Sequence, residues 1–422
     1  MDRENSISDH LVFFIHGMGQ QYEKYGNMKH HVATMQKNTD DIITSHYPHS
    51  NIRIKYIPIE WHSVIHEIVD PKISKSTLST VPKVRLATNH WLMDCLYYFT
   101  KPHGQHIINS ICYECNLAYK QHVIDYPDFI ENKGHIHFIG FSLGGISAYD
   151  IASMQWLEED GLPPWDVVEE DERTCKTPDI QVPKLDFKIT CVFTCGSPIA
   201  AGLVCRGLDY MHYRPPLRTK IFNIFHPFDP LGYRLEPMID ERYNTIQPVQ
   251  IHRIHKKNLL PRIPNLGIKS SIAGAQPLLR SFWQYLTSPS PEKTQELQEK
   301  ETFSKKRQRE QHTTTFRVKR MRYSCETLIA QEMEALELEK SDTSSPPSSS
   351  EDENSDCSSL IGKDGRSYPR TDYVLSENII DAYASEWIIA LKSHFRYWAN
   401  RDLTLHMVKT LLGKSSEVSN TV

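Results

Sequence analysis

The stretch HFIGFSLGG, residues 137–145, places Ser142 between glycines directly after a short apolar run. The apolar run predicts a buried strand, and the residues from Leu143 to about Trp156 predict a helix. Residues 140–144 fit the pattern G-x-S-x-G, in which a nucleophilic serine on a tight strand-to-helix turn needs neighbours without bulky side chains. Glycine and serine also gather in ordinary turns, so the pentapeptide alone leaves a nucleophile and a turn residue as alternatives. The flanking strand and helix favour the nucleophile.

Further strand and helix patterns extend on both sides of this motif. A helical pattern covers residues 75–125, and strand, turn and helix follow one another around Ser142 as in the βα unit of a parallel sheet. The sequence therefore predicts an α/β-hydrolase-like fold, in which a mostly parallel sheet is flanked by helices. The predicted strands are residues 10–16, 51–61, 135–141, 187–198 and 220–230.

A change of composition interrupts the predicted core. A long segment is rich first in Glu, Lys and Arg and then in Ser, Pro and acids, so it cannot bury enough apolar surface to fold and predicts a disordered insertion. Helical patterning resumes after it, from about Ser376 to Trp398. The predicted parts are a tail at 1–9, the core at 10–287, the insertion at 288–366, the end of the core at 367–412 and a tail at 413–422.

Charge and composition argue against several classes of protein. The 422 residues carry a formal net charge of -4, which argues against bulk nucleic-acid binding. No apolar run approaches the roughly 18 residues that span a bilayer, and the start MDRENSISDH lacks a signal sequence, so we expect a cytoplasmic protein. Cys112 and Cys115 form a lone C-x-x-C, which predicts a buried pair in a helix rather than a metal site. We expect no cofactor, with a divalent metal ion as the less favoured alternative.

A serine nucleophile needs a base and an orienting carboxylate, which follow the serine in the order acid and then histidine. Asp229, at the tip of the last predicted strand of the core, is the candidate acid, and an ordinary Asp-Pro turn is the alternative. His394, in LKSHFRYW, is the candidate base, and a buried core histidine is the alternative. The other histidines that follow Asp229 are less favoured. They are His252, His255, His312 and His406.

An oxyanion hole requires two backbone N–H groups near the serine. The amide of Leu143, at the start of the predicted helix, is one candidate. The loop HGMG after the first predicted strand supplies the other, from Gly17 or Met18. His16 precedes Ser142 in the chain, so we expect it to hydrogen-bond structurally rather than to act as a second base.

Seven stretches occur in one order along the chain: HLVFFIHGMGQ, IPIEWHS, GFSLGG, CGSPIA, NIFHPFDPLGYRLEPMI, RTDYVL and SHFRYW. In this order they resemble the DDHD-domain phospholipases, the intracellular phospholipase A1 family, from residue 10 to about 412 except in the insertion. This family is named for three aspartates and a histidine. The resemblance implies that these are Asp229, Asp372, His394 and Asp402. If Asp229 and His394 serve the serine, Asp372 and Asp402 support the site or cap turns, and a metal site made of all four is the alternative.

The resemblance implies hydrolysis of an acyl ester of glycerophospholipids, such as phosphatidic acid, at a membrane surface. A catalytically weak membrane-trafficking scaffold and a metal-dependent phosphoesterase are the alternatives. The chain starts almost at its first predicted strand, so nothing is carried over from the N-terminal modules of larger relatives. The expected partner is an anionic membrane, contacted peripherally, and no nucleic acid is expected.

Residues 252–286 combine basic and aromatic side chains, as an interfacial segment does. A solvated basic loop followed by a core helix is an equally favoured alternative. The candidate membrane contacts are Lys256, Lys257, Arg262, Phe282 and Trp283.

Overall fold

The computed structural model describes seven stretches of the chain, residues 7–19, 28–167, 175–254, 359–362, 365–376, 389–390 and 393–413. The chain divides into two compact units, residues 1–286 with 358–422 and residues 287–357. All described residues belong to the first unit.

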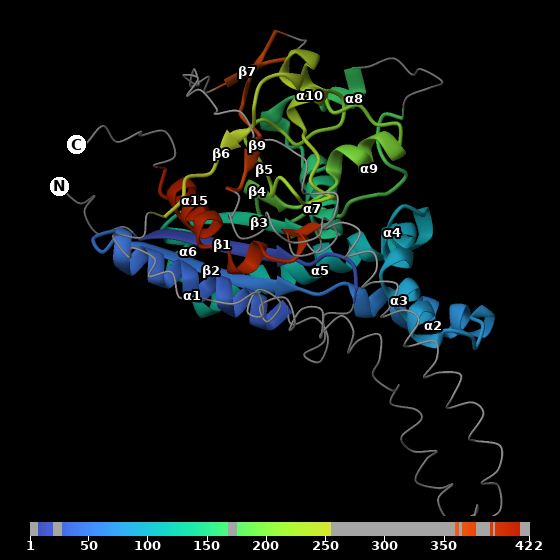
Figure 1. The fold of residues 1–422 in the computed structure, drawn as a ribbon. Coiled ribbons are helices and arrows are strands. Elements are labelled where there is room, and N and C mark those ends of the chain that lie inside the picture. The colour runs from blue at the N-terminus through green and yellow to red at the C-terminus, as the bar shows by residue number, and fades with distance from the viewer. Residues whose placement is uncertain are drawn as a thin grey trace, which may run out of the picture. The chain divides into compact units, whose positions relative to one another are not determined.

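Seven strands form the central sheet, in the order β2-β1-β3-β4-β5-β9-β6, and every neighbouring pair is parallel (Figure 1). The predicted α/β fold with a mostly parallel sheet is therefore confirmed. The strands are β1 (Ser8–Ile15), β2 (Ile52–Ile59), β3 (His135–Phe141), β4 (Ile189–Cys195), β5 (Lys220–Phe225), β9 (Asp372–Val374) and β6 (Val249–Gln250). A separate antiparallel pair consists of β7 (Ser359–Ile361) and β8 (Ser367–Pro369).

The central strands β1, β3 and β4 are mostly apolar and mostly buried, because both faces of the sheet are covered. In β1, Leu11, Phe13 and Ile15 belong to one buried cluster, whereas Val12 and Phe14 belong to another. Alternate side chains of a strand point to opposite faces, so the two clusters are the two layers of the core.

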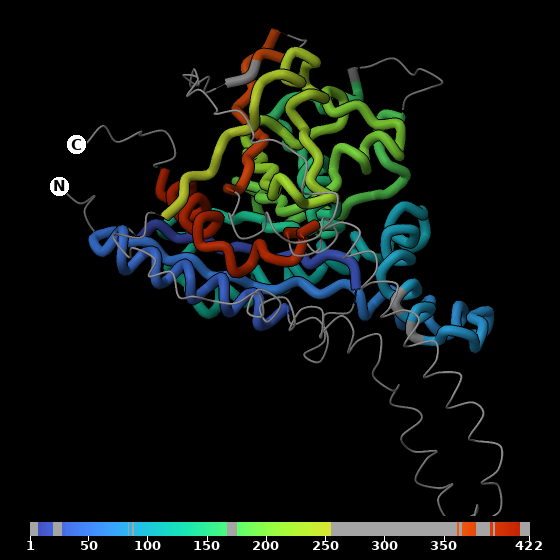
Figure 2. The backbone as a smooth tube through the Cα atoms, in the orientation of Figure 1, coloured from blue at the N-terminus to red at the C-terminus, as the bar shows by residue number. Residues whose placement is uncertain are grey.

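Helices from distant parts of the sequence cover each face. Residues of α5 (Lys101–Asp125) and α7 (Leu143–Ser153) fill the first cluster, and residues of α1 (Met28–His46) and α15 (Arg401–Leu411) fill the second. Figure 2 shows the C-terminal α15 beside the N-terminal α1. The other helices are α2 (His62–Ser76), α3 (Pro82–His90), α4 (Leu92–Tyr98), α6 (Asp128–Glu131), α8 (Pro164–Val167), α9 (Ile199–Cys205), α10 (Glu236–Ile239) and the 3-10 helices η1 (Glu158–Asp160), η2 (Glu241–Asn244) and η6 (Tyr397–Ala399). Among the described residues, no helix is both long and apolar enough to cross a membrane.

The helix predicted through Trp398 is wrong at its C-terminal end. The backbone is helical at residues 393–394, turns at Phe395 and continues as η6. Asn400 then accepts the N–H of Leu403 at 3.0 Å and so caps α15. Trp398 packs against strand residues of the sheet, and this tertiary contact overrides the helical pattern.

The strand order reverses direction at β1. The chain places β2 on one side of β1 and then returns to place β3 on the other side. In an open α/β sheet, ligands bind beyond the carboxyl ends of the strands at such a switch point. The loop that begins at His16 and the turn at Ser142 lie at these ends.

Candidate active site

Ser142 is the single residue between β3 and α7, a helix that ends at Ser153 rather than at the predicted Trp156. Its backbone has φ 50° and ψ -122°, a conformation that is rare outside glycine and costs about 1–3 kcal/mol. The side chain is buried, and its Oγ has no hydrogen-bond partner among the described residues. A buried, unpartnered hydroxyl on a strained turn has the features of a candidate nucleophile.

Close packing of the backbone explains the glycines around Ser142. A Cβ on Gly140 would lie 2.5 Å from the carbonyl oxygen of Gly144, and a Cβ on Gly144 would collide with the carbonyl oxygen of His16. The Oγ of Ser197 donates to the carbonyl oxygen of Ser142 at 2.7 Å and holds the turn from the β4 side. Sequence reasoning missed Ser197, which is one of the last two residues of the predicted strand 187–198, beyond the observed end of β4 at Cys195.

Asp229 and His394 lie in direct contact. The Nδ1 of His394 is 3.0 Å from Oδ1 and 3.1 Å from Oδ2 of Asp229, and both side chains are buried. When Nδ1–H donates to this carboxylate, the free lone pair of the neutral imidazole is on Nε2. The structure therefore brings together the acid and the base that chain order predicted.

Tyr397 holds the Asp229 carboxylate from a second direction. Its hydroxyl donates to Oδ2 of Asp229 at 2.6 Å and accepts the N–H of His226 at 2.9 Å. The N–H of Leu231 donates to Oδ1 of Asp229 at 2.9 Å. Burial and the charge of Asp229 raise the pKa of Tyr397 well above its ordinary value, so the phenol stays a donor. Sequence reasoning missed this tyrosine, which lies three residues after His394.

Gly196 makes room for this network. It follows β4 with φ 54°, a left-handed conformation that glycine adopts without strain. A Cβ at this position would collide with Oδ2 of Asp229 and would lie 2.8 Å from the Tyr397 ring. The glycine of the CGSP stretch is therefore required by two separate constraints.

Aromatic packing brings the imidazole to the Ser142 turn. The ring of Phe141, the residue before Ser142, has its centroid 4.8 Å from that of His394. Trp398 packs edge-on against Phe141 with centroids 4.2 Å apart. The chain around His394 is thus held at the carboxyl end of β3, where Ser142 lies.

The loop after β1 also reaches Ser142. A Cβ on Gly17 would lie 2.9 Å from the Cβ of Ser142, so this backbone passes directly over the serine. The amides of Gly17 and Met18 donate to no other described residue. Leu143 is the first residue of α7, where helix amides have no intrahelical partner. All three amides remain the predicted oxyanion donors.

His16 supports that loop. Its Nδ1 donates to the carbonyl oxygen of Gly17 at 2.6 Å, and its Nε2 accepts the N–H of Trp61 at 3.2 Å. Its ring stacks on the Trp61 indole with centroids 4.9 Å apart. Burial lowers the pKa of His16 to about 3, so the ring is neutral at neutral pH. These contacts agree with the structural role expected for His16.

Asp372 belongs to a different network, at the start of β9. Its carboxylate accepts the N–H groups of Leu235 at 2.9 Å and Glu236 at 3.2 Å, and it pairs with Nε of Arg234 at 3.1 Å. Glu236 in turn accepts Nε of Arg370 at 2.8 Å. Burial and the neighbouring Glu236 raise the pKa of Asp372. The network connects β9 to the segment after β5. Sequence reasoning missed Glu236, the second carboxylate of this network.

Asp402 connects two chain segments. It lies in the first turn of α15, and its Oδ1 accepts the N–H of Ile254 at 2.9 Å. This bond fixes the chain after β6 to the C-terminal helix. Asp372 and Asp402 therefore each hydrogen-bond within a separate network, and neither is hydrogen-bonded to Asp229 or His394.

The remaining predicted residues fall into two groups. His252 is exposed, and His406 lies between the rings of Phe222 and Tyr373, with centroids 6.0 and 4.8 Å away. The others lie outside the described residues. These are His255, His312, Lys256, Lys257, Arg262, Phe282 and Trp283.

Several groups of side chains in the described part of the chain have residue types that can bind a metal ion. Cys112 and Cys115 are buried in α5, as predicted. Within the part of the chain that the structure describes, His62, His66 and His90 form a group whose ligand atoms lie close enough together to hold a metal ion. Asp229, Asp372, His394 and Asp402 do not form such a group.

Comparisons with known proteins give the following matches. A family model described as the DDHD domain matches residues 185–412. "Phospholipase DDHD1" of Mus musculus is 30% identical over 300 residues, which cover 62% of this chain and 54% of that protein. "Triacylglycerol hydrolase DDHD2" of Mus musculus is 24% identical over 511 residues, 96% of this chain and 68% of that protein. "Intracellular phospholipase A1" of Caenorhabditis elegans is 25% identical over 280 residues, 57% of this chain and 32% of that protein.

The matched part of the chain spans between about a third and about half of the length of the first relatives. No solved structure matches the chain.

Proposed function

Because the chain belongs to the DDHD-domain family, we propose that it is a serine-dependent lipase of the phospholipase A1 type. It hydrolyses an acyl ester of a glycerophospholipid, with phosphatidic acid as the candidate substrate, at the surface of an intracellular membrane. The observation that carries the proposal is the Asp229–His394 pair, packed through Phe141 beside the strained, unpartnered Ser142.

The proposed reaction has two steps. In the first, Ser142 Oγ attacks the acyl carbonyl carbon while His394 Nε2 takes the hydroxyl proton. The tetrahedral intermediate collapses, the bond to the glycerol oxygen breaks, and that oxygen leaves with the proton as the lysophospholipid. In the second step, water gives a proton to His394 and attacks the acyl-enzyme. His394 passes that proton to Ser142 Oγ as the ester bond breaks, which releases the fatty acid and restores the serine hydroxyl.

The other residues of the site act on these steps indirectly. Asp229 fixes the imidazole with Nδ1–H toward the carboxylate and stabilises the imidazolium that forms. Tyr397 positions Asp229 through the 2.6 Å bond. The amides of Leu143 and of Gly17 or Met18 stabilise the developing oxyanion.

A metal-dependent phosphoesterase built from Asp229, Asp372, His394 and Asp402 has less support. Asp372 is occupied by Arg234 and two backbone amides, and Asp402 by the amide of Ile254. A phosphoesterase of that kind needs its carboxylates and histidine around one ion.

The products distinguish the candidate functions. Purified protein is incubated with phosphatidic acid vesicles, and all products are quantified by mass spectrometry. We expect fatty acid and lysophosphatidic acid in equal amounts. Inorganic phosphate and diacylglycerol would contradict the lipase and indicate the phosphoesterase. A folded protein that releases no product, and that hydrolyses no soluble short-chain ester either, would indicate the scaffold.

α4 carries exposed apolar side chains near the proposed site. Leu92 and Leu96 lie one turn apart on this helix and are 58% and 51% exposed. α4 also contacts the loop over Ser142, since Asp94 accepts the N–H of Gly19 at 2.7 Å. An exposed apolar pair on a helix suits peripheral contact with a bilayer.

Replacing Leu92 and Leu96 together with glutamate should lower the partitioning of the protein onto phosphatidic acid vesicles by at least about tenfold, because apolar contact is lost and charge repulsion is added. Vesicle sedimentation measures this. Hydrolysis of a soluble short-chain ester should be retained. Leu117→Glu on α5 is the matched control, since Leu117 is 51% exposed and Leu96 is 51% exposed. Equal partitioning of both variants would show that α4 does not contact the bilayer.

A further inference from the structure

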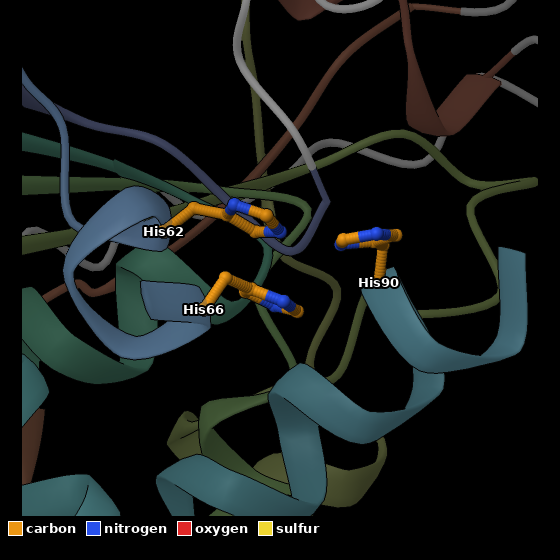
Figure 3. A group of neighbouring side chains, drawn as sticks. All are labelled: His62, His66 and His90. Atoms are coloured by element: carbon orange, nitrogen blue, oxygen red, sulfur yellow. The ribbon is translucent and has the colours of Figure 1, made fainter. Parts of the chain in front are cut away.

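Three buried histidines converge at a place that the proposed reaction does not use. His62 and His66 lie one turn apart on α2, and His90 is the last residue of α3. The rings of His62 and His66 stack with centroids 3.8 Å apart, and those of His66 and His90 are 4.5 Å apart. Figure 3 shows the rings of His62 and His66 side by side, both extending from α2 toward the ring of His90. One ring nitrogen of each lies within 4.8 Å of the others.

His62 is buried although neither of its ring nitrogens has a hydrogen-bond partner among the described residues. The residue is 1% exposed, its ring centroid lies 6.2 Å from that of Trp61, and Oδ2 of Asp94 lies 3.6 Å from Nε2, beyond hydrogen-bond distance. Buried polar atoms without partners are rare in folded proteins and indicate a missing ligand, ion or water. A neutral imidazole, which has a free lone pair, is the form that binds a metal ion.

Two carboxylates complete the surroundings of the histidines. Asp94 is fully buried, and its Oδ1 lies 2.7 Å from Nε2 of His66 while its Oδ2 lies 3.6 Å from Nε2 of His62. Asp70 lies on the other side of His66, with Oδ1 2.7 Å from Nδ1. A carboxylate that holds the second nitrogen of a histidine is the usual support of a metal-binding imidazole.

We propose that His62, His66 and His90 bind a divalent transition metal ion of the zinc type, with Asp94 as the fourth ligand. Three imidazoles and a carboxylate form a ligand set that zinc prefers in tetrahedral geometry. Zinc–nitrogen bonds of about 2.0–2.1 Å place ligand atoms roughly 3.3 Å apart. The His62 and His66 rings stack with their planes 12° apart, so binding requires them to turn about their side-chain bonds until their in-plane lone pairs meet at the ion.

Binding also requires one proton to leave. Nε2 of His66 and Oδ1 of Asp94 lie 2.7 Å apart and share one proton, which passes to solvent when both atoms bind the ion. Asp94 exchanges its contact with Nε2 for the metal, and Asp70 keeps its bond to Nδ1. The net charge of the site changes by one, and no redox step is involved.

The ion would join α2, α3 and α4 to the loop over Ser142. Asp94 already accepts the N–H of Gly19, and Sγ of Cys95 lies 4.0 Å from Sδ of Met18. A metal ion at this place is structural, because it holds the loop rather than touching the reacting atoms. This consequence for the loop depends on the proposed function, whereas metal binding itself does not.

The test measures metal content directly. Full-length protein is purified, its metals are counted by mass spectrometry, and protein stripped with a chelator is titrated with Zn²⁺ and with Co²⁺. We expect one equivalent of zinc, a higher melting temperature with zinc, and the intense visible absorption of tetrahedral cobalt. Asp70→Asn should weaken binding about 10–100-fold, and His62→Gln and His90→Gln should weaken it further.

Matched variants separate this site from other histidines and from the lipase proposal. His122→Gln on α5 removes another buried histidine, 3% exposed, and should bind zinc as the wild type does. Ser142→Ala should also bind zinc normally, even if the lipase proposal fails. Wild-type protein that binds no zinc stoichiometrically, or equal binding by the wild type and Asp70→Asn, would overturn the site. The Asp70 side chain is 43% exposed, so this variant tests the site even if His62→Gln does not fold.

Discussion

Ser142→Ala is expected to lower kcat for ester hydrolysis by roughly 10⁴-fold or more, because the change removes the oxygen that attacks the acyl carbon. Labelling by a fluorophosphonate probe should be abolished for the same reason. The variant should melt at nearly the wild-type temperature, since Oγ has no hydrogen-bond partner among the described residues. Hydrolysis of a soluble short-chain ester, probe labelling and thermal melting are the three measurements.

Ser147→Ala is the matched control for this prediction. Ser147 is buried in α7, the helix that follows Ser142, and its Oγ donates to the carbonyl oxygen of Leu143 at 3.2 Å within that helix. The control should be labelled and active at the wild-type level. If Ser142→Ala kept its labelling or its rate, the serine of the strained turn would not be the nucleophile.

The sheet and Ser142 could be anticipated from the sequence because their signals are local. A buried strand is an apolar run whatever its partners are, and a tight strand-to-helix turn requires small residues within two positions of the serine. Chain order, the position of Asp229 at a strand tip and the aromatic neighbours of His394 then favoured these two over the other carboxylates and histidines after Ser142. The structure places these two side chains in contact.

The supporting residues could not be anticipated because their contacts join distant parts of the chain. Tyr397 meets Asp229 across 168 positions, and Glu236 meets the backbone of Asp372 across 136. The sequence next to Tyr397 and Glu236 does not differ from that around a tyrosine or glutamate without such a role. The helix predicted through Trp398 failed for the same reason, since its end is set by packing against Phe141 rather than by periodicity.

Asp229→Asn is expected to lower kcat by about 10⁴-fold while leaving the protein folded. The asparagine amide can donate to Nδ1 of His394, which moves the ring proton to Nε2 and leaves no lone pair to take the proton of Ser142. The asparagine has one acceptor oxygen where Asp229 has two, so either the hydroxyl of Tyr397 or the N–H of Leu231 loses its acceptor. We expect this to cost about 1–3 kcal/mol of folding stability without unfolding the protein. Kinetics with a soluble ester and a thermal melt measure the two effects separately.

Asp372→Asn should show the opposite pattern, and the comparison decides between the triad and a metal site of four residues. Asp372 accepts four hydrogen bonds, from Asn223, Arg234, Leu235 and Glu236. An amide in its place turns an NH₂ group toward two of these donors, which should cost about 1–3 kcal/mol of folding stability. The folded fraction should keep kcat within roughly tenfold of the wild type, because Asp229 and His394 are untouched. Equal losses of kcat in both variants would contradict the triad, because only a shared catalytic ion would make the two carboxylates equivalent.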